Sequence, residues 1–64
     1  MTNTDVQIEV TLTDEEAWQL AQFEKRLSFT DVRQCAENNE DTYTMLAAMM
    51  KVGRALREKG YNPR

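Results

Sequence analysis

The sequence predicts a small α+β domain, mostly helical, in which one N-terminal strand precedes three helices in the order β-α-α-α. Three observations predict this class: strict alternation of apolar and polar residues over 6–12, a helix-capping pattern at Thr13, and apolar residues at helical spacing in a long C-terminal segment. The chain has 64 residues, which is enough for a single domain spanning 1–64.

The strand is predicted over residues 6–12, and residues 1–5 are expected to be frayed. β-Branched residues dominate one face of the alternation, which is typical of a half-buried strand. That face consists of Val6, Ile8, Val10 and Leu12. A lone strand leaves backbone donors and acceptors unmet. We expect it to pair with the C-terminal tail near Tyr61 or with the same strand of a second copy, so the chain is a monomer or a homodimer; an unpaired extended segment is the third alternative.

The first helix is predicted over residues 14–27. Thr13 fits its N-cap, and Glu16 three residues later completes a capping box. Acidic residues in the first turn agree with the helix dipole. An apolar stripe runs from Ala17 to Leu27, and Trp18 lies on its flank, where it either covers the edge of the core or faces a partner.

The second helix is predicted over residues 31–37, capped by Thr30. It is expected to turn Val32, Cys35 and Ala36 inward, and Asn38–Asn39 supplies the next turn.

The third helix is predicted over residues 40–59. Its inward stripe is expected to consist of Tyr43, Leu46, Ala47, Met50, Gly53 and either Leu56 or Ala55. Gly60 and Tyr61 predict a Schellman-type stop at its C-terminus.

The residue types that the chain lacks argue against several classes of function. The chain has no histidine and one cysteine, Cys35, which excludes an internal disulfide and a Cys/His metal site. We interpret Cys35 as a small core residue. No nucleophile lies beside a base and no glycine-rich phosphate loop occurs, so we predict a non-enzymatic protein without a cofactor or metal. No signal segment or membrane span is expected, which predicts the cytoplasm of a bacterial cell.

Charge is polarised along the chain: residues 1–24 hold six acids and no base, and residues 51–64 hold five bases and one acid. An acidic surface that meets a basic protein partner is the first functional hypothesis, and helix-start chemistry is the competing explanation for the same acids. The candidate partner-binding residues are Asp5, Glu9, Asp14, Glu15, Glu16, Trp18, Glu37, Glu40 and Asp41. Such a surface can imitate a phosphate backbone and occupy a nucleic-acid-binding groove.

A basic set in the third helix supports the alternative hypothesis, a small nucleic-acid-binding or regulatory module. The set consists of Lys51, Arg54, Arg57 and Lys59. A strand paired across a dimer would also resemble ribbon-helix-helix DNA-binding proteins, which insert strand side chains into the major groove. Here Glu9 would face phosphates, which disfavours that version.

Two stretches carry a resemblance to known proteins. The run Leu12-Thr13-Asp14-Glu15-Glu16-Ala17-Trp18-Gln19-Leu20-Ala21-Gln22-Phe23 and the ending Gly60-Tyr61-Asn62-Pro63-Arg64 resemble small proteins carried on bacterial prophages and integrating elements. In size, acidity and lack of catalytic residues, the chain also resembles anti-CRISPR proteins. That resemblance implies stoichiometric inhibition of a CRISPR surveillance complex, of a type I system such as I-C, by covering its DNA-entry surface.

Overall fold

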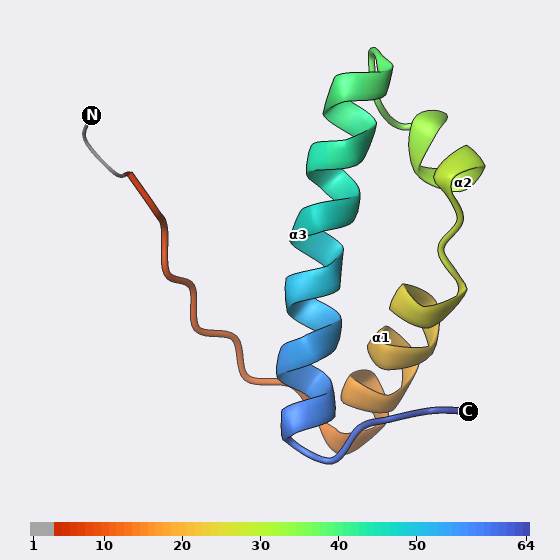
Figure 1. Cartoon of the computed structure of the whole chain (residues 1–64). Helices are drawn as coiled ribbons and strands as arrows, with labels where there is room; N and C mark the ends of the chain where they lie inside the picture. The colour runs from red at the N-terminus through yellow and green to blue at the C-terminus, as the bar shows by residue number, and fades with distance from the viewer. Residues whose placement is uncertain (1–3) are drawn as a thin grey trace.

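The computed structural model describes residues 4–64, which form three helices preceded by an extended segment (Figure 1). Helix α1 spans Asp14–Arg26, α2 spans Phe29–Arg33 and α3 spans Asn39–Glu58. Both shorter helices pack against α3, with α1 beside its C-terminal half and α2 beside its N-terminal half. The resulting shape is flat, with principal extents of 33 × 31 × 15 Å.

Helix α1 begins where the capping pattern predicts. The Glu16 backbone N–H donates to Thr13 Oγ1 at 3.0 Å, and the Thr13 N–H donates to Glu16 Oε1 at 2.9 Å. This reciprocal pair satisfies two of the donors that every helix start leaves without a partner. The helix ends at Arg26, one residue before the predicted end, because Leu27 adopts an extended backbone.

Helix α2 differs from the prediction in its cap and its length. Ser28, rather than Thr30, is the N-cap, and it forms a capping box with Asp31 in which both hydrogen bonds measure 3.2 Å. The helix therefore starts two residues early and ends at Arg33. Because Cys35 lies beyond this end, it is exposed rather than part of the core, which corrects our interpretation of it.

Helix α3 ends in the predicted Schellman motif. The Tyr61 N–H donates to the Leu56 carbonyl at 2.9 Å, and the Gly60 N–H donates to the Arg57 carbonyl at 3.0 Å. Gly60 has φ of 99°, in the left-handed region that glycine enters without a Cβ penalty. The motif turns the chain back so that residues 61–64 lie beside α1.

Replacing Gly60 with alanine is expected to destabilise the protein. An added Cβ would meet no atom within 4 Å, so the cost comes from the backbone conformation alone. We expect a loss of about 1–2 kcal/mol in the free energy of unfolding. Urea denaturation followed by circular dichroism measures it, and Gly60→Asn, which tolerates this conformation better, should lose less. Equal losses in the two variants would contradict the backbone explanation.

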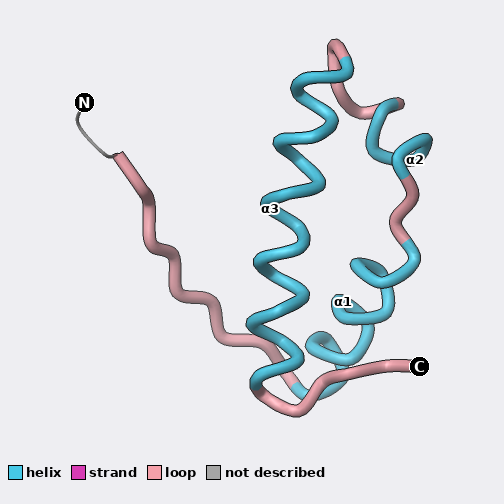
Figure 2. Tube along the Cα trace, viewed as in Figure 1, coloured by secondary structure: helices cyan, strands magenta, loops and turns pink. Residues whose placement is uncertain are grey.

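The predicted strand is absent. Within residues 4–64 no segment has strand pairing, so the α+β class was wrong and the described fold is all-helical (Figure 2). The tail is not available as a partner, because Lys25 Nζ donates to the Pro63 carbonyl oxygen and Tyr61 contacts α1. Alternation alone therefore does not make a strand here. We call residues 4–12 the arm. Residues 1–3, part of the segment predicted to be frayed, lie outside the described residues.

The core is small and lies between α1 and α3. Ala17, Ala21 and Leu56 are buried there, and the partly buried residues Leu12, Leu20, Val52 and Tyr61 pack around them. Alanine on α1 lets the two helices approach closely. Where α2 meets α3, Val32 and Thr42 are buried, and Thr42 Oγ1 donates to the Asn38 carbonyl at 2.9 Å.

The inward stripe of α3 also differs from the prediction. Tyr43 and Met50 were expected to point inward, but both side chains are 64% exposed. Gly53 and Leu56 of the predicted stripe are buried, and they are joined by Thr42, which was not predicted to point inward. The buried face of the helix therefore overlaps the predicted stripe and is shifted from Tyr43 toward Thr42.

The molecule exposes more surface than a compact chain of its mass. Its accessible area is 5742 Å², whereas about 4,200 Å² is expected for a compact 7.5 kDa monomer. Its radius of gyration, 13.2 Å, exceeds the roughly 10.7 Å expected for 64 residues. Three apolar side chains contribute to this surface, since Val6, Ile8 and Val10 are 83%, 74% and 66% exposed. A fold with this surface favours association with another molecule.

Candidate binding surfaces

The acidic start of α1 lies beside the C-terminal end of α3, because the two helices run antiparallel (Figure 1). Asp14, Glu15 and Glu16 are exposed there. Glu16 is engaged in the capping box, and Asp14 accepts a hydrogen bond from the Tyr61 hydroxyl at 2.6 Å. Glu15 has neither of these roles. Local folding therefore employs two of these three carboxylates and leaves one for contact with solvent or a partner.

Trp18 and Tyr61 form an aromatic pair at this end of the molecule. Their ring centroids lie 5.0 Å apart in an edge-to-face arrangement, and Trp18 remains 38% exposed. Asp14 and Trp18 are one turn apart on α1, so Asp14 accepts a hydrogen bond from the Tyr61 hydroxyl while Trp18 contacts the Tyr61 ring. The expected flank position of Trp18 thus covers the edge of the core and still presents part of the indole to solvent.

The Asp14 contact changes the acidity of the Tyr61 phenol. The hydrogen bond to Asp14, partial burial and the carboxylate charge together raise the pKa of Tyr61 above its ordinary value of 10.0. The protonated phenol is the form that donates to Asp14, whereas a phenolate would repel it. The contact is therefore stable in the pH range where most proteins are studied.

Alkaline pH is expected to release this contact. Because the pKa of Tyr61 is raised on folding, its stabilising contribution is present below the unfolded pKa of 10.0 and is lost as pH rises through the higher folded value. Urea midpoints from pH 8 upward measure the effect. The advantage of the wild type over Tyr61→Phe should shrink beyond pH 10. An advantage that stayed constant across this range would contradict the assigned contact.

A second acidic group lies at the opposite end of the molecule. Glu37, Glu40 and Asp41 surround the start of α3, where Asn38 Oδ1 caps the helix by accepting from the Asp41 N–H at 2.8 Å. Helix α3 has 20 residues and is therefore about 30 Å long. The structure does not bring these acids together with those at the start of α1. Asp5 and Glu9 lie on the arm, and both are exposed.

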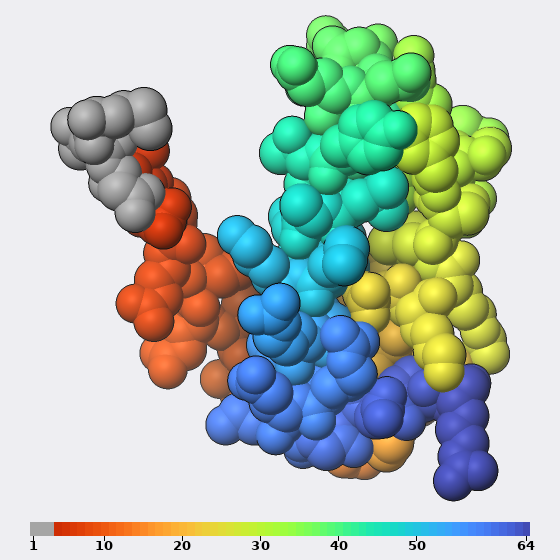
Figure 3. Space-filling view, in the orientation of Figure 1, coloured from red at the N-terminus to blue at the C-terminus, as the bar shows by residue number. Residues whose placement is uncertain are grey.

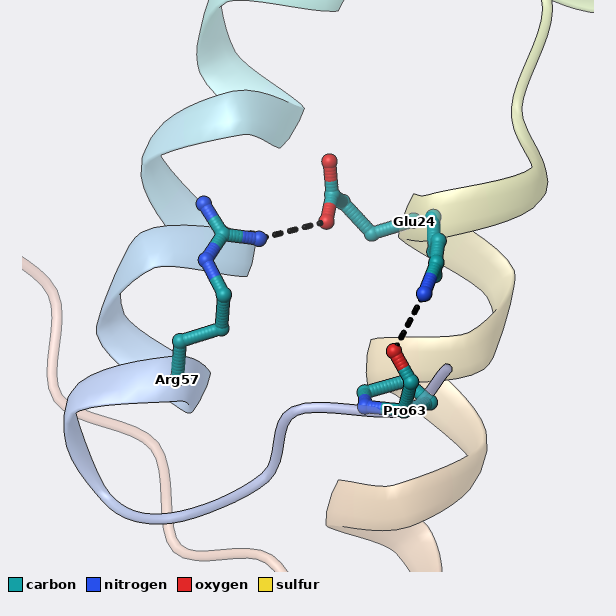
Figure 4. Close-up of polar contacts among 4 residues, drawn as sticks. Glu24, Arg57 and Pro63 are labelled. Atoms are coloured by element: carbon teal, nitrogen blue, oxygen red, sulfur yellow. Dashed lines mark hydrogen bonds and ion pairs between the residues drawn. The ribbon is translucent and has the colours of Figure 1, made fainter.

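Glu24 is the acidic residue of the N-terminal half that lies in the interface between α1 and α3. Glu24, whose side chain is only 14% exposed, lies 3.4 Å from Arg57 across the α1–α3 contact (Figure 4). Its carboxylate covers Gly53, where an added Cβ would lie 2.1 Å from Glu24 Oε1. Arg57 is half-exposed, so this ion pair is worth about 0–1 kcal/mol. Among the described residues it is the only ion pair, and it removes Arg57 from the free basic set.

The remaining members of the basic set are exposed cations. Lys51 and Arg54 lie on the C-terminal half of α3 and Lys59 is its C-cap, and none of the three has a carboxylate partner within residues 4–64. They share this end of the molecule with the acidic start of α1. The acidic and basic ends of the sequence are thus neighbours in the structure, which makes this end mixed in charge rather than uniformly acidic.

An apolar groove, which the sequence interpretation missed, runs where α1, the α1–α2 connection and α2 face α3. Its volume is about 1020 Å³. Six side chains make up most of its apolar wall: Phe23, Leu27, Val32, Cys35, Met45 and Met49. Phe23 is 57% exposed and Met45 is 39% exposed, so the groove is open to solvent. The available signal was Phe23 beside the α1 stripe and two methionines off the predicted α3 stripe.

A model of a protein family of unknown function (DUF7706) matches residues 1–64. The chain belongs to this family. Neither a comparison with curated proteins nor one with solved structures gave a match.

Family membership carries no stated activity, and it does not indicate a phage or anti-CRISPR origin. The resemblance to such proteins therefore adds nothing to the structural argument. The α+β description attached to it is wrong for the described residues, because they contain helices and no strand.

Within residues 4–64 no group of three or more Cys, Asp or Glu side chains is arranged to hold a metal ion. None of the helices in this range has the length and apolar character needed to cross a bilayer.

Proposed function

We propose that this protein is a binding module that meets a basic protein surface through its acidic junction. The acidic junction consists of Glu9, Asp14, Glu15, Glu16 and Trp18, together with Tyr61. The observation that carries the proposal is a partly exposed aromatic pair, Trp18 and Tyr61, that lies among carboxylates and is hydrogen-bonded to one of them, Asp14. Binding hot spots are enriched in tryptophan and tyrosine, and a rigid anchor loses little entropy on binding.

The carboxylates of the acidic junction form no ion pair with a basic side chain of the described residues. Asp14 accepts from a neutral hydroxyl and Glu16 from a backbone N–H, while Glu24 forms the only ion pair within the described residues. Unneutralised charge attracts a basic partner over about 10 Å at moderate salt, and it mainly raises the association rate. The junction is therefore suited to fast, salt-sensitive binding of a basic surface, including one that normally holds nucleic acid.

Reversing the charge of carboxylates that make no folding contact tests the binding role of the acidic junction without disturbing the fold. Glu9→Lys with Glu15→Lys changes two exposed carboxylates that lie outside the capping box and the Tyr61 contact. The matched control is Glu37→Lys with Glu40→Lys, which makes the same change in charge at the other end of α3.

The experiment captures partners from a bacterial lysate with the wild type and then measures their affinities. We expect the junction variant to bind at least tenfold more weakly, which corresponds to about 1.4 kcal/mol, and the control to stay within twofold. Binding should also weaken with added salt. The proposal fails if the junction variant binds as the wild type does, or if both variants lose affinity equally.

A second candidate function rests on the exposed cations of α3. Lys51 and Arg54 lack carboxylate partners among the described residues, so both are free to contact phosphates. A gel-shift assay with DNA and RNA at low salt tests this module. Binding that is lost in Lys51→Glu with Arg54→Glu, and kept in the junction variant, would favour nucleic acid over a basic protein as the partner.

The expectations of a non-enzymatic role and a cytoplasmic location belong to this proposal. Both follow from the residue types discussed above and remain predictions. Partner capture from a cytoplasmic fraction addresses the second of them directly.

A further inference from the structure

We propose that this chain forms a two-fold symmetric homodimer in which the arm of each copy lies in the apolar groove of the other. The inference does not rest on the acidic junction, with which the arm shares only Glu9; it concerns the apolar face of the arm and the groove. It joins two exposed apolar features that the fold leaves without intramolecular cover, the arm and the groove. A contact that uses both features on both copies is self-complementary, as two-fold symmetry requires.

The arm has the form of a recognition segment. It is extended, and Val6, Ile8 and Val10 share one face at 83%, 74% and 66% exposure. At its end, Leu12 packs against the α1–α3 core and fixes where the arm leaves the molecule. Figure 3 shows the start of the described chain, in red, standing apart from α3.

The groove matches the arm in length and chemistry. Val6 to Val10 spans about 13 Å when extended, and the groove follows α1 from Gln19 to Leu27, about 12 Å. The groove lining is mostly apolar, and it also includes Arg26, Asp31 and the amides of Gln19, Gln22 and Gln34. Amide side chains both donate and accept hydrogen bonds, so they can satisfy the unpaired backbone groups of an extended segment.

The arm that lies in the groove belongs to a second copy, because the arm of the same chain extends away from its own groove. Helix α3 stands between the arm and the α1–α2 side of the molecule (Figures 1 and 2). The Leu12 contact holds the exit point of the arm on that far side. A copy related by a two-fold axis can present its arm to the groove while both cores stay intact.

The exposed area is sufficient for such a dimer. The chain exposes roughly 1,500 Å² more than a compact chain of 7.5 kDa, and a standard interface buries about 800 Å² from each partner. The excess is therefore large enough to supply an interface of standard size.

Disulfide trapping tests the contact, since Cys35 lies in the groove and is the only cysteine of the chain. The variants Val6→Cys, Ile8→Cys and Val10→Cys place a thiol on the apolar face of the arm, and Gln7→Cys is the matched control on the opposite face. Mild oxidation of one of the first three should give dimers linked from the arm to Cys35 at least ten times faster than the control. Peptide mapping identifies the bond.

Three outcomes would overturn the proposal. An arm-to-Cys35 bond within a single chain would assign the groove to the chain's own arm. A bond between the two arms would place them against each other rather than in grooves. Rates no higher than that of Gln7→Cys would exclude a specific contact.

The mass in solution gives an independent readout by sedimentation equilibrium. The wild type should sediment at twice 7.5 kDa, and a monomer at all concentrations up to about 1 mM, a weak affinity limit, would overturn the proposal. Val6→Asp with Ile8→Asp should weaken the dimer at least tenfold. Gln7→Asp with Thr11→Asp adds the same charge to the opposite face and should change dimerisation less than threefold; equal loss in both variants would overturn the contact.

Discussion

Leu56→Ala is expected to abolish stable folding. Leu56 is 9% exposed and is the one large apolar side chain among the buried residues between α1 and α3, where its neighbours are Ala17 and Ala21. Removing a buried leucine side chain typically costs about 2–5 kcal/mol. A single core of this size rarely supplies more than about 3–5 kcal/mol.

Met50→Ala is the control for this variant. Met50 lies on the same helix and has a side chain of similar size, but it is 64% exposed. We expect a change within about 0.5 kcal/mol in the free energy of unfolding, as for most surface substitutions. Circular dichroism during urea denaturation measures both variants. Similar stabilities for the two would contradict the assignment of Leu56 to the core.

The sequence predicted the helix ends well, because each end is set by residues close together in the chain. The Thr13–Glu16 capping box and the Gly60 stop both satisfy backbone groups within one turn. At α2, both Ser28 and Thr30 could cap the helix. Ser28 is the N-cap, because Asp31 three residues later completes a capping box with it. Local patterns therefore place a helix end only when all candidate caps are compared.

The strand was wrong and the α3 stripe was wrong at Tyr43 and Met50 for a shared reason, which is that both predictions depend on a neighbouring segment. Alternation from Val6 to Leu12 makes a strand only where another segment supplies hydrogen bonds, and the tail is held by α1 instead. Tyr43 and Met50 fit helical spacing, yet the face that is buried is set by where α1 and α2 pack. Sequence periodicity identifies a stripe but not the direction from which it is covered.

The sequence predicted only part of the candidate site, because some of its residues come together only through the packing of distant segments. Acids near Thr13 are close in sequence and stay close in space, whereas Glu37, Glu40 and Asp41 lie at the far end of α3. The position of Tyr61 beside Trp18 depends on the turn at Gly60 and on antiparallel packing, which join segments 43 residues apart. The groove requires three elements at once, so no local pattern indicates it.

Gly53 illustrates how one position couples the two long helices. The three nearest atoms that an added Cβ would meet all belong to Glu24, at 2.1, 2.4 and 3.0 Å. Glycine in a helix interior costs about 1 kcal/mol relative to alanine. Its presence here is explained by the space that the Glu24 carboxylate occupies on its way to Arg57.

Gly53→Ala is therefore expected to have different effects in two backgrounds. In the wild type it displaces the Glu24 side chain and breaks the contact with Arg57, and we expect this loss of about 1 kcal/mol to offset the better helix propensity, so that the free energy of unfolding changes by less than about 0.5 kcal/mol. In a Glu24→Ala background the obstruction is gone, and the same substitution should stabilise the protein by about 1 kcal/mol. A double-mutant cycle in urea measures the coupling, about 1 kcal/mol between these two residues. Equal effects in both backgrounds would show that Glu24 does not set the requirement for glycine.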